Sequence, residues 1–214
     1  MPRSKSAILI LIIQGVLVME IMTGVMTRTW SAVFVAASTL GLTFLPQRFA
    51  GMLGIELPRS ILTAIVVFIF ASMFLGEMAD FYERFWWWDV VLHFTSAMTF
   101  GLMGFLLIFM LFEGDRYAAP PWALSVLAFS VGLSIGALWE IFEFSMDQIF
   151  GMNMQKSGLM DTMKDLIIDT FGAALGALFG FLYLKERQLG GLGRVMEQFV
   201  HANQRFYGKL RKKD

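Results

Sequence analysis

The sequence contains no cysteine and few charged residues for its length. Charged side chains make up 16% of the 214 residues, against about a quarter in an ordinary soluble domain. Hydrophobic residues make up 57%. Without cysteine, neither a disulfide framework nor a thiolate metal site can form. The composition therefore argues against a soluble fold and predicts a membrane protein.

Proline is also scarce, and its positions indicate unbroken membrane helices. A helix needs about 20 predominantly apolar residues to cross a hydrocarbon core about 30 Å thick. The sequence contains six apolar stretches near that length, and all five prolines lie outside them. We expect an all-α, polytopic transmembrane helix bundle with six spanning helices, at residues 7–26, 30–45, 61–76, 86–112, 122–144 and 165–184. Residues 1–184 then form one transmembrane domain, and a transporter built on discontinuous helices is disfavoured.

The distribution of basic residues predicts the orientation in the membrane. Cytoplasmic loops carry an excess of Lys and Arg. With six spans, the termini and the even-numbered loops share one side. That side carries thirteen basic residues and the other side four: Arg3, Lys5, Arg48, Arg59, Arg116 and eight between Lys185 and Lys213, against Arg28, Arg84, Lys156 and Lys164. We expect both termini to be cytoplasmic, and because topology explains the basic residues, we expect no nucleic-acid binding.

We expect residues 185–214 to form a basic, amphipathic cytoplasmic tail. Apolar residues such as Met196 and Phe199 recur at mostly helical spacing, with Arg194 and Arg205 between them. This pattern predicts an interfacial helix on the anionic cytoplasmic leaflet. The alternative is a partly disordered tail that serves only topology.

Ionisable residues inside or just before the last three predicted spans are the main functional signal. Within each helix they are three or four positions apart, so they share one helix face. Counted at about 1.5 Å per residue, all lie within about 10 Å of the outer surface. A charge in hydrocarbon needs a partner, a proton or water. The set comprises Asp89, His93, Glu140, Glu143, Asp161, Asp165 and Asp169.

Small residues continue the same helix faces below the acidic residues. Gly172 and Gly176 extend the Asp165 and Asp169 face, and Gly136 lies one turn before Glu140. Small residues mark close helix contacts in membranes. We therefore expect these three helices to pack closely and to hold the acids between them, open toward the outside.

So many carboxylates in one pocket require positive charge, because like charges oppose one another's ionisation. A divalent metal ion is one answer, with identity open among Mg, Mn, Ca, Fe and Zn. Its predicted ligands are Asp89, His93, Glu140, Glu143, Asp165 and Asp169, and the candidate general acids or bases are Glu140, Glu143 and Asp161. Protons are the second answer, which would make the cluster a relay or ion-coupling site. The third possible source of positive charge is a set of salt bridges at the outer surface with Lys156, Lys164 and Arg84, which would give the cluster a structural role without catalysis or transport.

Three further acids are weaker candidates for this site. Glu20 is a lone acid on an otherwise apolar helix, where it can bond to a neighbouring helix. Glu77 and Asp80 fit a solvated loop or the mouth of the pocket. The sequence leaves open whether any of them joins the cluster.

These motifs resemble the YjdF-type family of bacterial inner-membrane proteins. The resemblance rests on Asp89 and His93, on WEIFEF at 139–144, on GLMDTMKDL at 158–166 and on the following Gly172 and Ala173. It covers about the second half of the chain, and implies an inner-membrane location but no established reaction. The family's polar positions correspond to Asp89, His93, Glu140, Glu143, Asp161 and Asp165.

The chain is less similar to the VanZ-like membrane proteins. It has Glu143 where a Gln is usual and Asp169 where an Asn is expected. We therefore carry over no role in glycopeptide resistance.

Three functions are compatible with these patterns. The first is a metal-dependent enzyme that acts on a lipid headgroup or lipid-linked molecule at the outer leaflet. The second is an ion- or proton-coupled transporter or channel that uses the same acids, and the third is a structural or accessory membrane protein. The sequence has no phosphate-binding glycine loop or nucleotide fingerprint, so it does not name a reaction.

Overall fold

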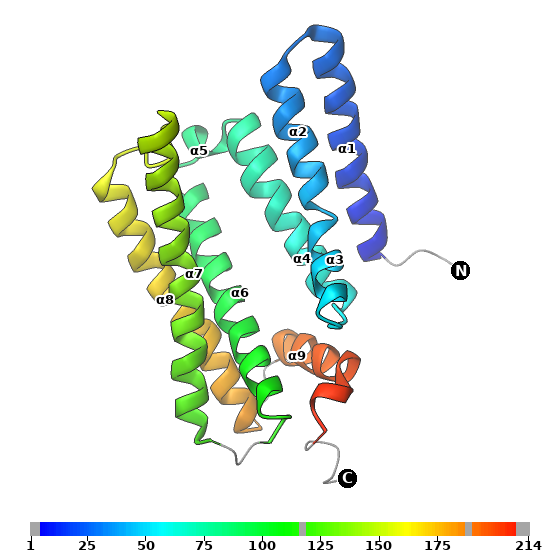
Figure 1. The fold of residues 1–214 in the computed structure, drawn as a ribbon, viewed down its shortest axis with the longest axis vertical. Helices are drawn as coiled ribbons and strands as arrows, with labels where there is room; N and C mark the ends of the chain where they lie inside the picture. The colour runs from blue at the N-terminus through cyan, green and yellow to red at the C-terminus, as the bar shows by residue number, and fades with distance from the viewer. Residues whose placement is uncertain (1–4, 116–118, 187–189, 209–214) are drawn as a thin grey trace. The chain divides into compact units, whose positions relative to one another are not determined.

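The computed structural model describes residues 5–115, 119–186 and 190–208, and all regular secondary structure in these ranges is helical (Figure 1). This confirms the all-α prediction. Arg3, Arg116 and several tail residues counted for topology (Arg187, Lys209, Arg211, Lys212 and Lys213) lie outside the described residues. The elements are α1 (Lys5–Thr27), α2 (Trp30–Leu42), α3 (Leu45–Met52), α4 (Arg59–Ile69), η1 (Phe70–Met78), α5 (Phe81–Arg84), α6 (Trp88–Leu111), α7 (Pro121–Phe150), α8 (Leu159–Leu184), α9 (Gly190–Ala202) and η2 (Gln204–Phe206).

Five helices have the length and apolar composition of membrane spans. They are Lys5–Thr27, Arg59–Met78, Trp88–Leu111, Pro121–Phe150 and Leu159–Leu184. Each contains most or all of one predicted span, and many of their large apolar side chains are exposed, as lipid-facing residues are. The protein is therefore a multi-pass membrane protein.

The second predicted span, 30–45, is divided between two shorter helices. Helix α2 has 13 residues, or about 20 Å of helix, which is short of the hydrocarbon thickness of about 30 Å. The chain turns at Thr43 and Phe44, and α3 then starts with Pro46 in its first turn. Because proline has no N–H for the helical ladder, it favours a new helix start over a continuous helix.

The third predicted span is also less regular than expected. Its second half, η1, is a π-helix, and the N–H of Ala79 after it donates to the carbonyl oxygen of Phe74. Gly76 in η1 packs against the ring of Tyr82, where a Cβ would clash. The helix contains no proline, but its winding changes from α to π at Phe70.

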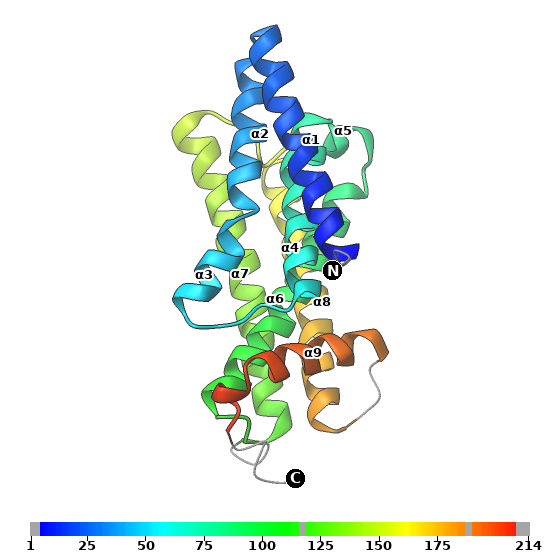
Figure 2. The same ribbon diagram turned by 90° about the vertical axis from the view of Figure 1, so that its right-hand side faces the viewer.

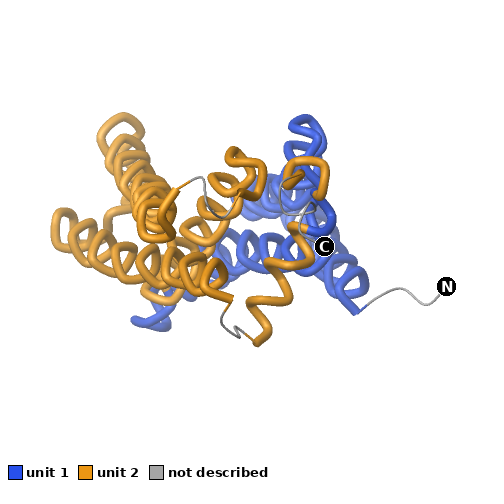
Figure 3. The backbone as a smooth tube through the Cα atoms, turned by 90° about the horizontal axis from the view of Figure 1, so that it is seen from below, with its two compact units in different colours: residues 1–88, 201–203 blue, residues 89–200, 204–214 orange. Residues whose placement is uncertain are grey.

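The chain divides into two compact units (Figure 3). Unit 1 comprises residues 1–88 and 201–203, and unit 2 comprises residues 89–200 and 204–214. In unit 1, α1, α2 and α4 surround a small core that contains Ile13, Leu17, Ala36 and Val66. In unit 2, α6, α7 and α8 lie side by side (Figures 1 and 2).

Glycines let the three long helices of unit 2 approach closely. A Cβ added at Gly101 of α6 would lie 2.8 Å from the carbonyl oxygen of Ala173 in α8. One added at Gly132 of α7 would lie 2.9 Å from the backbone nitrogen of Gly101. These contacts confirm the predicted close packing, because any larger side chain would separate the backbones.

Most of the described tail is helical, in α9 and η2. Helix α9 runs crosswise to α6, α7 and α8 (Figure 2), and its Met196 and Phe199 side chains are fully buried. Between residues 190 and 208, no large apolar side chain is exposed. The apolar face of this segment is therefore covered by protein, and its position on the cytoplasmic leaflet stays a prediction.

Candidate functional site

Three helices of unit 2 bring the predicted polar residues together. Asp89 lies in the first turn of α6, and His93 follows one turn later. Helix α7 supplies Glu140, and α8 supplies Asp165 and Asp169 one turn apart. The close packing of these helices places buried polar groups opposite one another.

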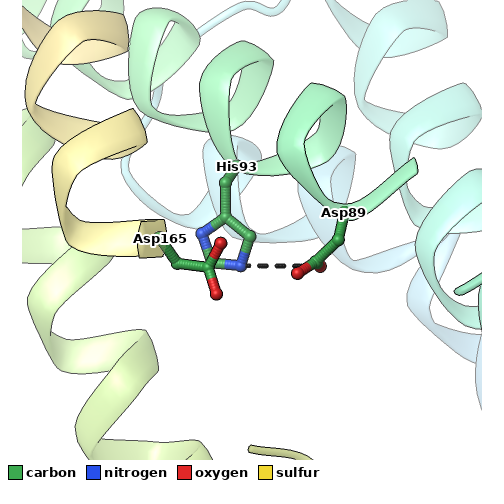
Figure 4. Close-up of side chains that lie close together, drawn as sticks. All are labelled: Asp89, His93 and Asp165. Carbon is green, nitrogen blue, oxygen red and sulfur yellow. Dashed lines mark ion pairs between the residues drawn. The ribbon is translucent and has the colours of Figure 1, made fainter. Parts of the chain in front are cut away.

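Asp89, His93 and Asp165 form the centre of the cluster. One potential ligand atom from each residue lies within 4.8 Å of the other two. The Nε2 atom of His93 is 3.8 Å from Oδ1 of Asp89. Figure 4 shows the three side chains close together, with Asp165 contributed by α8 and the other two residues by α6.

The cluster is closed on most sides. His93, Glu140, Asp165 and Asp169 are all buried, whereas the side chain of Asp89 is 37% exposed. Lys156, which is exposed, attracts Asp89 electrostatically. Access to the cluster is therefore from the side of Asp89.

Glu140 faces the same nitrogen of His93 as Asp89 does. Its Oε1 atom is 3.9 Å from Nε2. Glu140 is nevertheless not one of the three residues, Asp89, His93 and Asp165, whose ligand atoms lie within 4.8 Å of one another. Neither of its carboxylate oxygens meets ordinary hydrogen-bond geometry with a group in the described part of the chain, although the side chain of Thr162 lies near enough to interact with it. Since burial of an unpaired carboxylate is costly, this side chain requires a cation, a proton or water next to it.

Asp169 contacts the other nitrogen of His93. Its Oδ1 atom is 3.2 Å from Nδ1, and its Oδ2 atom has no hydrogen-bond partner among the described residues. Gly136 of α7 makes room for this carboxylate, because a Cβ there would clash with Oδ2. The sequence predicted Asp169 in the cluster but could not predict which nitrogen it faces.

The other two predicted acids lie at the edge of the cluster. Oε1 of Glu143 accepts a hydrogen bond of 2.8 Å from Nε1 of Trp139, on an exposed part of α7. Asp161 is half-buried in the first turn of α8 and repels Asp89 and Asp165 electrostatically. Neither residue is in the group formed by Asp89, His93 and Asp165.

The three weaker candidates lie in unit 1, whereas the cluster lies in unit 2. Glu20 is half-buried in α1, and Glu77 is exposed in η1. Asp80 is 3.9 Å from Arg84 in an exposed ion pair. The cluster described above is assembled without them.

Sequence reasoning missed the role of Asp147. Its carboxylate accepts hydrogen bonds from the backbone nitrogens of Met154 (2.7 Å) and Gln155 (2.9 Å), and the side chain of Gln155 donates to Thr162. These bonds order the connection between α7 and α8. The signal for this role in the sequence was an acidic residue four positions before a glycine, Gly151. In the structure α7 ends at that glycine, which has a positive φ angle.

Comparison with known proteins identifies the family. A profile described as "Predicted membrane protein (DUF2238)" matches residues 7–186. The chain belongs to the DUF2238 family. An uncharacterised protein of Thermotoga maritima is 31% identical over 117 residues, which cover 55% of this chain and 59% of that protein. The chain thus aligns with less than two thirds of that relative's length, and no solved structure matches it.

Membership of the DUF2238 family confirms the membrane placement that the sequence predicted. The finer resemblance to the YjdF-type proteins is consistent with this family, and it stays a prediction. The likeness to the VanZ-like proteins receives no support from these matches.

Proposed function

We propose that this DUF2238 protein binds a divalent metal ion through Asp89, His93 and Asp165. The observation that carries the proposal is the meeting of one imidazole and two carboxylates from α6 and α8 within 4.8 Å. Metal bonds to such ligands are about 2.0 to 2.2 Å long, so ligand atoms around one ion lie up to about 4.4 Å apart. Small side-chain adjustments would bring the three residues into that range.

The charge of the cluster supports a cation. Asp89, Glu140, Asp165 and Asp169 outnumber the one imidazole among them. A protonated His93 would still leave an excess of carboxylates, and a divalent ion offsets two negative charges at once. Imidazole combined with carboxylates suits Zn, Fe or Mn better than Ca, which prefers oxygen ligands alone.

The proposed location is the outer face of the bacterial inner membrane. If α2 and α3 together are counted as the second of six crossings, the excess of basic residues at the termini and even-numbered loops supports cytoplasmic termini, which would put the start of α6 and the end of α7 at the periplasmic side. The half-exposed Asp89 gives access near the headgroup level. We infer that the substrate is a lipid headgroup or a lipid-linked molecule.

The residues of the cluster then have separate roles. A bound ion would polarise a phosphoryl or carbonyl oxygen of the substrate. Glu140 is the best-supported general acid or base, because its carboxylate is buried, unpaired and directed toward the imidazole nitrogen that faces the ion. Glu143 and Asp161 are second candidates at the edge of the site.

Metal analysis of the purified protein tests this proposal. We expect about one ion per chain in the wild type and a loss of that ion in His93→Ala and Asp165→Asn. Glu20→Gln is the matched control, because it removes a carboxylate from a membrane helix of unit 1. Equal metal content in all four proteins would contradict the proposal.

A second candidate is an ion- or proton-coupled transporter. It is favoured by the same unpaired oxygens of Glu140 and Asp169, since protons would satisfy them as well as a metal would. It predicts cation- or pH-dependent flux in proteoliposomes that Asp165→Asn abolishes. Under the remaining structural alternative, Glu143→Gln would change thermal stability and nothing else.

A further inference from the structure

The two ring nitrogens of His93 face different carboxylates. Nδ1 is 3.2 Å from Oδ1 of Asp169, which is within hydrogen-bond distance. Nε2 is 3.8 Å from Asp89 and 3.9 Å from Glu140, which is too far for hydrogen bonds. The imidazole is therefore within hydrogen-bond distance of a carboxylate on its Nδ1 side, and on its Nε2 side it has only the longer ion-pair contacts.

A neutral imidazole carries one proton, and its hydrogen-bond partner decides which nitrogen carries it. A carboxylate accepts but cannot donate, so Asp169 favours the tautomer with the proton on Nδ1. The lone pair of Nε2 then lies on the side of the ring that faces Asp89 and Glu140. Metal-binding histidines are commonly oriented by a carboxylate in this way.

The packing around Asp169 shows that this contact has a dedicated place in the fold. The side chain is 1% exposed, and its carboxylate lies against Gly136 of α7. Any side chain at position 136 would displace Oδ2 of Asp169. Gly136 thus permits a buried carboxylate between α7 and the imidazole.

We propose that Asp169 is a positioning residue that presents Nε2 of His93 as the metal ligand. This inference rests on the proposed metal site, and it gives a role outside the ligand set to Asp169, which the sequence alone placed among the ligands. The ion is then held by three protein ligands, Asp89, His93 and Asp165, with Glu140 unliganded beside it. Three-ligand sites keep a coordination position open for water or substrate, whereas structural sites are closed.

Titration with Co²⁺ distinguishes a positioning residue from a ligand. We expect Asp169→Asn to weaken Co²⁺ binding 10- to 100-fold, with one ion per chain and an unchanged visible spectrum at saturation. Gly136→Ala should weaken binding in the same direction, and Gly15→Ala, where a Cβ meets open space, should not. Loss of saturable binding in Asp169→Asn, as expected for Asp165→Asn, would overturn the proposal, and so would an unchanged affinity.

Nitrogen NMR of the metal-free protein reports the tautomer of His93. It therefore tests the role of Asp169 independently of the proposed metal binding. The chain has two histidines, so His201→Gln leaves the His93 signals alone in a histidine-labelled sample. At a pH where the ring is neutral, we expect the proton on Nδ1 in the His201→Gln protein and on Nε2 once Asp169→Ala is added. The same tautomer in both proteins would overturn the role of Asp169. Absence of Co²⁺ binding in the wild type would instead overturn the metal site.

Discussion

The side chain of Asn203 makes two hydrogen bonds with the backbone of Glu56. Its Nδ2 atom donates to the carbonyl oxygen and its Oδ1 atom accepts from the backbone nitrogen, both at 2.8 Å. Asn203 is 1% exposed and belongs to unit 1, although it follows α9 in the chain. The tail is therefore tied to the loop between α3 and α4 by a specific pair of bonds.

Replacing Asn203 should destabilise unit 1. Asn203→Ala leaves both backbone groups of Glu56 without this partner, so we expect a loss of about 1 to 3 kcal/mol in the free energy of unfolding. Asn203→Asp keeps the acceptor and should lie between the alanine variant and the wild type. Unfolding in detergent measures the effect, with the exposed neighbour Gln204→Ala as the control. Equal stability of Asn203→Ala and Gln204→Ala would contradict this prediction.

Tyr207 should make stability depend on alkaline pH. Its hydroxyl donates a 2.8 Å hydrogen bond to the carbonyl oxygen of Leu106, and burial raises the pKa of the phenol above its ordinary value of about 10. As the pH rises past about 10, the unfolded chain releases this proton before the folded one does, so stability falls.

Tyr207→Phe isolates that contribution. At pH 8 we expect the variant to be about 0.5 to 1.5 kcal/mol less stable than the wild type, because the hydrogen bond is lost. Above pH 10 the difference should shrink, since phenylalanine does not ionise. Stability curves measured between pH 8 and pH 11 that stay parallel would contradict the expected pH dependence.

Gly176 should be intolerant of even one extra carbon. A Cβ on this residue of α8 would clash with the carbonyl oxygen of Met98 in α6. We expect Gly176→Ala to cost about 1 to 3 kcal/mol of stability through overpacking. Gly15→Ala in α1 meets open space and should be neutral or stabilising by up to about 1 kcal/mol. Similar thermal shifts in the two variants would argue against close packing of α6 and α8.

The absence of cysteine makes the orientation directly testable. Lys156→Cys and Gln204→Cys each introduce a single thiol at an exposed position. We expect a membrane-impermeant maleimide to label Lys156→Cys in intact spheroplasts and Gln204→Cys only after permeabilisation. The opposite pattern would reverse the orientation inferred from the basic residues.

Helical spacing predicted much of the candidate site. Asp165 and Asp169 are four residues apart and do share one face of α8, toward His93. Their contacts nevertheless differ, because Asp165 groups with Asp89 and the imidazole, whereas Asp169 contacts Nδ1. Spacing places side chains on a face, but the orientation of the imidazole ring decides which carboxylate meets which nitrogen.

Local irregularities were harder to predict. The apolar run at 30–45 has the composition of a span, but Pro46 and the turn at Thr43 and Phe44 divide it from α3. The π-helix at Phe70–Met78 left no recognisable signal in its apolar sequence. Hydrophobicity reports how well a segment suits lipid and does not report how its backbone hydrogen bonds are arranged.

The sequence by itself determined the membrane environment, the helical secondary structure and the helix faces that carry acids, because hydrophobicity and helical period are properties of consecutive residues. Only the tertiary structure decided that Nε2 of His93 faces Asp89 and Glu140 while Nδ1 faces Asp169. Those contacts depend on how α6, α7 and α8 are rotated and on how closely their backbones approach. That approach is set by glycines such as Gly101, Gly132 and Gly136, which come together from separate parts of the chain.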